Sequence, residues 1–316
     1  MVSLLNVIRT CLMNELFAVE PSTFKTASEL KYFLKLFGPF AGRYIEEYPS
    51  KEWVDVVIQH FANVGELEKE RVKSVLRRAR EESCILNIVK NREWNPSESW
   101  IANAESWMAN GRYAPINKPP FFSNLILSGH EGTEGFGELS PTAEERIKSS
   151  SSEYRRVCDI LLHISYELYF IDPYLKITNR RVKDVISALL ENLLNGKCEK
   201  VTFITRASGV FENANRNVFC DDIETELKRI AKNNLKRGTI IKFLFVRDEE
   251  SQFKMHARYL LSIKGAVRLD QGFQSLPDLR KVDVSPVSKK VHDELCLTFI
   301  EGKNDFEITN CFEFTV

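Results

Sequence analysis

The chain has 316 residues, of which 43% are hydrophobic and 28% are charged. These proportions are ordinary for a folded protein and exclude a chain that is disordered throughout, and the length predicts two domains. Lysine and arginine together number 44, as do aspartate and glutamate, so the formal net charge is zero. A protein that coats nucleic acid through its overall charge is therefore excluded, and any nucleic-acid surface must be local.

Cysteine usage and hydropathy indicate the compartment. The 7 cysteines include no C-x-x-C pair, and their odd number and wide spacing favour free thiols in a reducing cytoplasm. The stretch MVSLLNVIRTCLMNELF lacks the basic start of a signal peptide and has the spacing of an amphipathic helix. No stretch approaches the roughly 18 apolar residues of a membrane span. We expect a soluble, cytoplasmic protein without a transmembrane segment.

Residues 1–112 are predicted to form an all-helical domain. Apolar residues recur at helical spacing near the N-terminus, after the candidate cap Ser28, and again over 53–61. A charged helix is expected over 66–90, where arginines alternate with glutamates. A solvated, salt-bridged face explains this alternation, and a ridge that binds nucleic acid is the alternative. Tryptophans that follow at intervals of six or seven residues fit a packed face or a contact with a protein partner: Trp94, Trp100 and Trp107.

Residues 113–152 are predicted to connect two domains. The segment is rich in proline and glycine and ends in a run of serines at 149–152. This composition is typical of a connection between compact units. Within it, the apolar run 121–127 is long enough for a strand that docks on the domain that follows.

Residues 153–316 alternate between helical and strand periodicity, which predicts a mixed α/β sheet. The whole chain is thus expected to be α+β. Helices are predicted over 153–166, 179–195 and 221–235. Strands are predicted over 167–172, 200–206 and 239–246, and then over 255–263, 266–270, 295–300 and 306–315.

Polar residues follow the predicted parallel strands and point to a site. Asp172-Pro173-Tyr174, Thr205-Arg206 and Arg247-Asp248 each stand at a carboxyl end, where open α/β sheets gather ligand-binding groups. In the predicted strand 255–263, alternation places His256 and Arg258 on one face. An imidazole beside a guanidinium suits an oxyanion or phosphate. No spacing typical of a metal site, cofactor-binding loop or nucleotide-binding P-loop occurs.

The order of these elements resembles the phospholipase D-like superfamily, whose signature is H-x-K, four residues, D, and a downstream glycine-containing patch. His256-Ala257-Arg258 matches H-x-K, Lys264-Gly265 matches the turn, and residues 269–273 match the patch. Arg258 replaces the family's lysine, Ile263 replaces its aspartate, and one copy of the motif is present. The resemblance covers roughly residues 153–316.

These departures make the chain similar to degenerate branches of the superfamily that bind without hydrolysis, including accessory proteins of prokaryotic anti-phage islands. The resemblance implies a binding or assembly subunit that holds a phosphate-bearing ligand, with nucleic acid favoured and anionic lipid second. The helical domain would then contact a protein partner. The candidate ligand-binding residues are Asp172, Tyr174, Arg206 and Asp270.

The alternative implied by the same resemblance is an active phosphodiesterase or nuclease. His256 would attack phosphorus, Arg258 and Arg206 would hold the developing charge, and a homodimer would supply the second motif. Each candidate also has a purely structural interpretation. His256 can be a hydrogen-bonded sheet residue, the arginines can pair with nearby aspartates, Asp172 can end its strand, and Tyr174 can pack.

Overall fold

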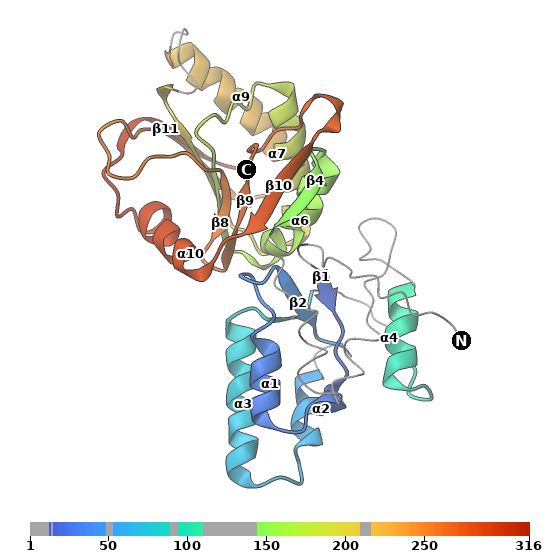
Figure 1. The fold of residues 1–316 in the computed structure, drawn as a ribbon. Coiled ribbons are helices and arrows are strands. Elements are labelled where there is room, and N and C mark those ends of the chain that lie inside the picture. Colours follow the sequence, from blue (N-terminus) through green and yellow to red (C-terminus); the bar gives the residue numbers. More distant parts are fainter. Residues whose placement is uncertain (1–12, 14, 49–52, 89–93, 110–143, 209–215) are drawn as a thin grey trace. The chain divides into compact units, whose positions relative to one another are not determined.

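The computed structural model describes residues 13, 15–48, 53–88, 94–109, 144–208 and 216–316. The chain divides into two compact units, Met1–Ala143 and Glu144–Val316. Each unit combines helices with a sheet, so the chain is α+β (Figure 1). The predicted strand 121–127 lies outside the described residues, as does most of the predicted N-terminal helix. No helix in the described ranges has the length and apolar character needed to cross a membrane.

The first unit contains a sheet, so the prediction of an all-helical domain is wrong. Three short strands pair in parallel in the order β1-β2-β3. The strands are β1 (Glu15–Phe17), β2 (Arg43–Glu46) and β3 (Ile85–Leu86). The helices are α1 (Ala27–Leu34), α2 (Trp53–His60), α3 (Glu66–Glu81) and α4 (Trp100–Ala109), and a 3-10 turn covers Pro21–Thr23.

The short length of the strands, and the complete burial of β2 and β3, explain this error. Every residue of β2 is buried, so β2 lacks the alternation of polar and apolar residues that marks a strand in sequence. The predicted helix 66–90 ends early because Ser83 adopts a positive φ of 59°, which a helix cannot continue through. The apolar run after Ser83 therefore supplies β3. At α1 the capping side chain is Thr26, which accepts from the Glu29 N–H, and not Ser28.

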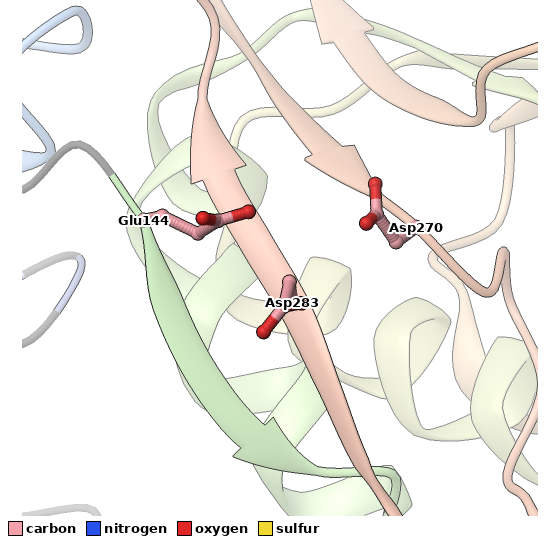
Figure 2. Close-up of side chains that lie close together, drawn as sticks. All are labelled: Glu144, Asp270 and Asp283. Atoms are coloured by element: carbon pink, nitrogen blue, oxygen red, sulfur yellow. The ribbon is translucent and has the colours of Figure 1, made fainter.

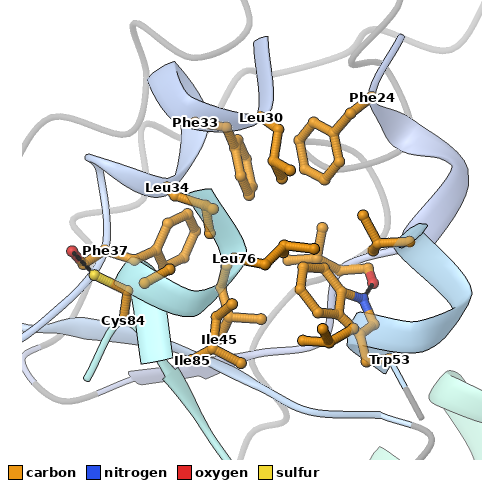
Figure 3. Close-up of a cluster of buried hydrophobic side chains, with 14 of the residues drawn as sticks. Phe24, Leu30, Phe33, Leu34, Phe37, Ile45, Trp53, Leu76, Cys84 and Ile85 are labelled. Atoms are coloured by element: carbon orange, nitrogen blue, oxygen red, sulfur yellow. Dashed lines mark hydrogen bonds between the residues drawn. The ribbon is translucent and has the colours of Figure 1, made fainter. Parts of the chain in front are cut away.

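The core of the first unit joins α1, α2 and α3 to the small sheet. Leu30, Phe33 and Leu76 meet in its centre (Figure 3). Trp53 is fully buried, and its indole N–H donates to the carbonyl of Val19. These contacts tie the helices to the chain segment between β1 and α1.

The second unit is built on an eight-stranded mixed sheet with the order β11-β7-β6-β5-β8-β9-β10-β4. β5, β6 and β7 are parallel, and all other neighbours are antiparallel. The strands are β4 (Glu145–Lys148), β5 (Glu167–Ile171), β6 (Lys200–Arg206), β7 (Ile240–Arg247), β8 (Tyr259–Ser262), β9 (Gly265–Leu269), β10 (Lys281–Pro286) and β11 (Glu307–Thr315).

Helices connect the parallel strands as the sequence predicts. Figure 1 shows α6, α7 and α9 together on one side of the sheet, and α10 with its continuation packs on Tyr169, Ile171 and Ile204. The helices are α6 (Ser151–Ile164), α7 (Arg180–Asn192), α9 (Arg216–Asn234) and α10 (Lys289–Leu295), with a π-helical turn at Cys296–Ile300 and 3-10 turns at Leu193–Asn195 and Pro277–Leu279.

Three details of the second unit differ from prediction. The expected strand 295–300 is the end of a helix, whose buried residues Leu295, Cys296 and Phe299 have helical spacing. The expected strand 255–263 begins only at Tyr259, so His256 and Arg258 precede β8 and do not share a strand face. β4 lies within the segment read as a connection, and it pairs with β10, which sequence analysis missed.

The core of the first unit supplies a matched test of stability. Leu76→Ala should lower the free energy of unfolding by about 2–5 kcal/mol, because Leu76 is 1% exposed and its removal leaves a cavity. Leu67→Ala on the same helix should cost under about 0.5 kcal/mol, since Leu67 is 68% exposed. Urea unfolding followed by circular dichroism measures both. Equal losses would contradict the packing of α3.

Candidate functional site

The predicted site residues lie at one edge of the sheet. The carboxyl ends of β5, β6 and β7 meet there because these strands are parallel. β8 runs antiparallel to β5 with Tyr259 opposite Ile171. The residue before β8, Arg258, therefore comes beside the residue after β5, Asp172. Register alone thus brings a cation and a carboxylate together.

Asp172 is the buried centre of this edge. Asp172 is 5% exposed, and its carboxylate accepts from the N–H of Tyr174 at 2.8 Å and from the N–H of Phe273 at 3.3 Å. The Nε atom of Arg258 lies 3.9 Å from its Oδ1 atom. Burial raises the pKa of Asp172 above its ordinary value, and the two backbone N–H groups and Arg258 offset only part of this effect. Asp172 therefore fastens the loop after β9 to the end of β5.

Gly272 allows this close approach. It adopts a φ of +69°, and a Cβ atom added there would stand 2.1 Å from the Oδ2 atom of Asp172. Any side chain would displace the carboxylate or the loop. The glycine of the predicted downstream patch is therefore needed because its backbone packs against Asp172. The sequence did not reveal this requirement.

Arg258 is held in place yet partly accessible. Its Nη1 atom donates to the carbonyl oxygen of Asp270 at 3.1 Å, and its guanidinium lies 5.4 Å from the ring centroid of Tyr174. The Arg258 side chain is 27% exposed and Tyr174 is 51% exposed. Because a guanidinium carries five N–H donors, Arg258 keeps donors for an oxyanion beyond the one used on Asp270.

Arg206 is committed to a structural ion pair. Its Nε and Nη2 atoms each donate to the Asp248 carboxylate at 2.7 Å, and Nη2 also donates to the carbonyl of Met255. Asp248 is 2% exposed and accepts from the N–H of Met255 at 2.6 Å. Burial opposes its ionisation, but the Arg206 guanidinium and the Met255 N–H outweigh burial and lower the pKa of Asp248. The contacts of Arg206 therefore fit the structural interpretation, in which this arginine pairs with a nearby aspartate.

His256 stands between these two clusters in sequence, but it joins neither. It is exposed, and no hydrogen bond or ion pair links it to another residue in the described part of the chain. Ile263, which occupies the position of the family's aspartate, is 68% exposed between β8 and β9. No described carboxylate orients the imidazole, as a nucleophilic histidine requires.

The Asp270 carboxylate lies near two other acids. Carboxylate oxygens of Glu144, Asp270 and Asp283 lie within 4.8 Å of one another (Figure 2). Asp270 pairs with Arg268 at 3.2 Å, and Asp283 pairs with Arg146 at 2.6 Å. Within the described residues, Asp270 meets Arg258 through its backbone carbonyl oxygen. The structure thus brings Asp172, Tyr174 and Arg258 together, with Gly272 and Phe273 added.

The Gly272 contact predicts a specific loss of stability. Gly272→Ala should be at least about 1–3 kcal/mol less stable than Gly302→Ala, since overpacking adds to the backbone strain. Gly302 is a matched control because it has a φ of +68° with no atom within 4 Å of an added Cβ. Urea unfolding of both variants measures the difference. Equal stability of the two would show that Gly272 does not press on Asp172.

The Arg206–Asp248 pair predicts a pH-dependent effect. Arg206→Met should cost about 3–5 kcal/mol at pH 7, because it leaves a buried carboxylate without its cation. Adding Asp248→Asn should restore part of that loss, since the amide oxygen still accepts from Met255. The lowered pKa means that Asp248 stabilises the fold above its unfolded-state pKa and stops doing so as the pH falls through the folded-state value.

The cost of Arg206→Met should accordingly shrink as the pH falls to about 4 and below. Urea unfolding of wild type, the single variant and the double variant at several pH values tests this. A cost that does not change between neutral and acid pH would show that the pair does not stabilise the fold through its charge.

Comparisons with known proteins leave the family open. No protein-family model matches the chain, and no curated protein matches it. A solved structure of TrmBL2, described as an archaeal chromatin protein with a novel mode of DNA binding, is similar at 13% identity. The match covers 88% of this chain and 92% of that one, with a TM-score of 0.26. A score this low shows no shared fold.

Proposed function

We propose that residues 144–316 form a degenerate phospholipase D-like domain that binds a phosphate-bearing ligand without cleaving it, with nucleic acid as the favoured ligand. The order of elements supports the resemblance. β5, α7, β6, α9 and β7 follow one another, then β8 directly after the H-x-R residues, a turn at Lys264-Gly265, β9, and Gly272. The family's active members act on phosphodiesters, so phosphate is the chemistry that a retained site would recognise.

The observation that carries the proposal is that the Arg258 guanidinium is held by its neighbours and is still partly exposed. This guanidinium is oriented by Asp172, Asp270 and Tyr174 but is still 27% exposed, two residues from the exposed His256. Arg206, by contrast, is neutralised by Asp248. An oriented, accessible guanidinium can hold non-bridging phosphate oxygens, and an exposed imidazole two residues away in sequence can add a contact. The proposed ligand contacts are therefore Arg258 and His256, with Tyr174 as a half-exposed aromatic surface.

The same contacts argue against hydrolysis. A nucleophilic histidine needs a group that fixes its tautomer and position, and His256 has none in the described residues. Arg206 would have to abandon a two-point ion pair with a buried carboxylate to stabilise a transition state. We therefore favour binding over the phosphodiesterase alternative.

The role of the first unit is part of the same proposal. Tyr32, Leu67 and Trp94 are exposed hydrophobic residues of this unit, at 54%, 68% and 40%. In this proposal these side chains are the candidates for contact with a protein partner. The proposed setting, an accessory subunit of a prokaryotic anti-phage system, follows from the resemblance alone.

Binding of fluorescent single- and double-stranded DNA and RNA oligonucleotides, measured by anisotropy, tests the proposal. Arg258→Ala should weaken binding by about 10–100-fold, the equivalent of a charge-assisted hydrogen bond, and His256→Ala by less. Arg237→Ala is the matched control, since Arg237 is exposed and precedes β7, at the end of the parallel strands opposite to the site. It should change binding by under about threefold.

Hydrolysis of a generic phosphodiester and of the same oligonucleotides completes the test. We expect no turnover by wild type. Turnover that disappears in His256→Ala, while its melting temperature matches the wild type, would establish the phosphodiesterase alternative. Equal binding by wild type and Arg258→Ala would show that the H-x-R residues are not a ligand site.

A further inference from the structure

A row of phenylalanines crosses four neighbouring strands of the second unit and stops at its edge. Phe170, Phe203, Phe243 and Phe312 are register partners from β5 through β6 and β7 to β11. Successive ring centroids are 4.9, 5.7 and 5.3 Å apart. The first three rings are fully buried, whereas Phe312 is only partly buried. The last member of the row lacks a neighbour on its outer side among the described strands.

The strand that carries Phe312 is an unprotected edge. β11 spans 9 residues, Glu307–Thr315, without proline, lysine or arginine. The opposite edge, β4, has 4 residues, and all but Ile147 are charged. Short length and charge are the usual means by which proteins prevent an edge from pairing with another chain. β4 has both features. β11 is long, and its protection is limited to two glutamates and a bulge near its start.

The outward backbone groups of β11 follow from its ladder with β7. The Val316 N–H donates to the Thr239 carbonyl at 3.0 Å, and the Val316 carbonyl accepts from the Gly238 N–H at 2.9 Å. In an antiparallel ladder such inward groups alternate with outward ones. The residues that point outward are Cys311, Glu313 and Thr315. Within the described chain no hydrogen bond reaches their N–H or carbonyl groups.

We propose that this edge pairs with β11 of a second copy of the chain, antiparallel, on a two-fold axis at Phe312. Symmetric registers bring outward residues opposite one another beyond the bulge when the axis lies at any residue from 311 to 315. An axis at 315 pairs only the end of the strand, and an axis at 314 opposes Phe314, whose partner on β7 is Ile241, so neither extends the phenylalanine row. The axis at 313 opposes Glu313 to itself, which is repulsive. The axis at 311 runs the ladder into the bulge between Ile308 and Asn310. The axis at 312 avoids both.

The axis at Phe312 also extends the phenylalanine row. Phe312 then lies opposite Phe312 of the second copy, so the row continues through Phe243 and Phe203 of that copy. The outward groups of Cys311 pair with those of Glu313 across the axis. A two-fold interface of this kind is closed, which limits assembly to a dimer. One continuous sheet spans both copies.

This dimer is independent of the proposed ligand site. β8 is four strands from β11 in the sheet, so the two His256 residues would be roughly 40 Å apart at the usual strand spacing. The second copy therefore completes neither site. Binding of phosphate-bearing ligands and pairing of the edges can each fail without the other.

Sedimentation velocity of the full chain across a dilution series tests the interface. Wild type should sediment as a dimer. Glu313→Pro should raise the dimer dissociation constant at least about tenfold, because it removes an outward N–H donor on each copy. Proline is tolerated on an edge strand whose N–H faces away from the sheet. Glu313→Ala keeps that donor and should remain dimeric.

Disulfide trapping tests the register and does not depend on a proline. Phe312→Cys in a Cys311→Ser background should form a disulfide-linked dimer on mild oxidation, because residues opposite one another at a non-hydrogen-bonded position lie about 4.5 Å apart at Cα. Glu313→Cys in the same background should not. A monomeric wild type, a Glu313→Pro dimer of unchanged affinity, or preferential trapping at 313 would each overturn the proposal.

Discussion

The buried carboxylate of Asp172 is the constraint on which the arrangement at the carboxyl ends of the parallel strands depends. It ends β5, binds the N–H groups of Tyr174 and Phe273, and lies 3.9 Å from the Arg258 Nε atom. Because the Asp172 side chain is only 8% exposed, its carboxylate must be compensated by nearby donors. The loop after β9 and the residue before β8 are therefore held at one point, and Gly272 is required because the loop passes so close.

Two arginines near the carboxyl ends of these strands differ in how their guanidinium groups are paired, because their partners differ. Arg206 meets Asp248 through two hydrogen bonds in a buried setting, which neutralises it. Arg258 meets Asp172 at a longer distance and is shared with the Asp270 carbonyl and the Tyr174 ring. The Arg258 side chain is 27% exposed against 16% for Arg206, and His256, two residues before Arg258, is exposed. This division favours a binding site with one oriented cation over a catalytic centre that needs several.

The sheet links the two proposals without making them interdependent. Its parallel centre creates the carboxyl edge where Asp172 and Arg258 meet, and its outermost strand, β11, leaves Phe312 half-buried. The site lies on β5 and β8, and the exposed edge lies on β11. A dimer through β11 would multiply the number of sites per assembly, which strengthens binding to a long polymer of repeated phosphates more than to a single phosphate.

The sequence by itself determined the α+β class, the order β5-α7-β6-α9-β7 and the presence of polar residues at the carboxyl ends, because hydrophobic periodicity and strand polarity are local properties. It missed β1, β2 and β3, which are too short or too uniformly buried to alternate. Tertiary structure alone decided that Arg206 pairs with Asp248, that Arg258 stays accessible, and that Gly272 abuts Asp172. These contacts join residues 40 to 100 positions apart, and only strand register sets such distances.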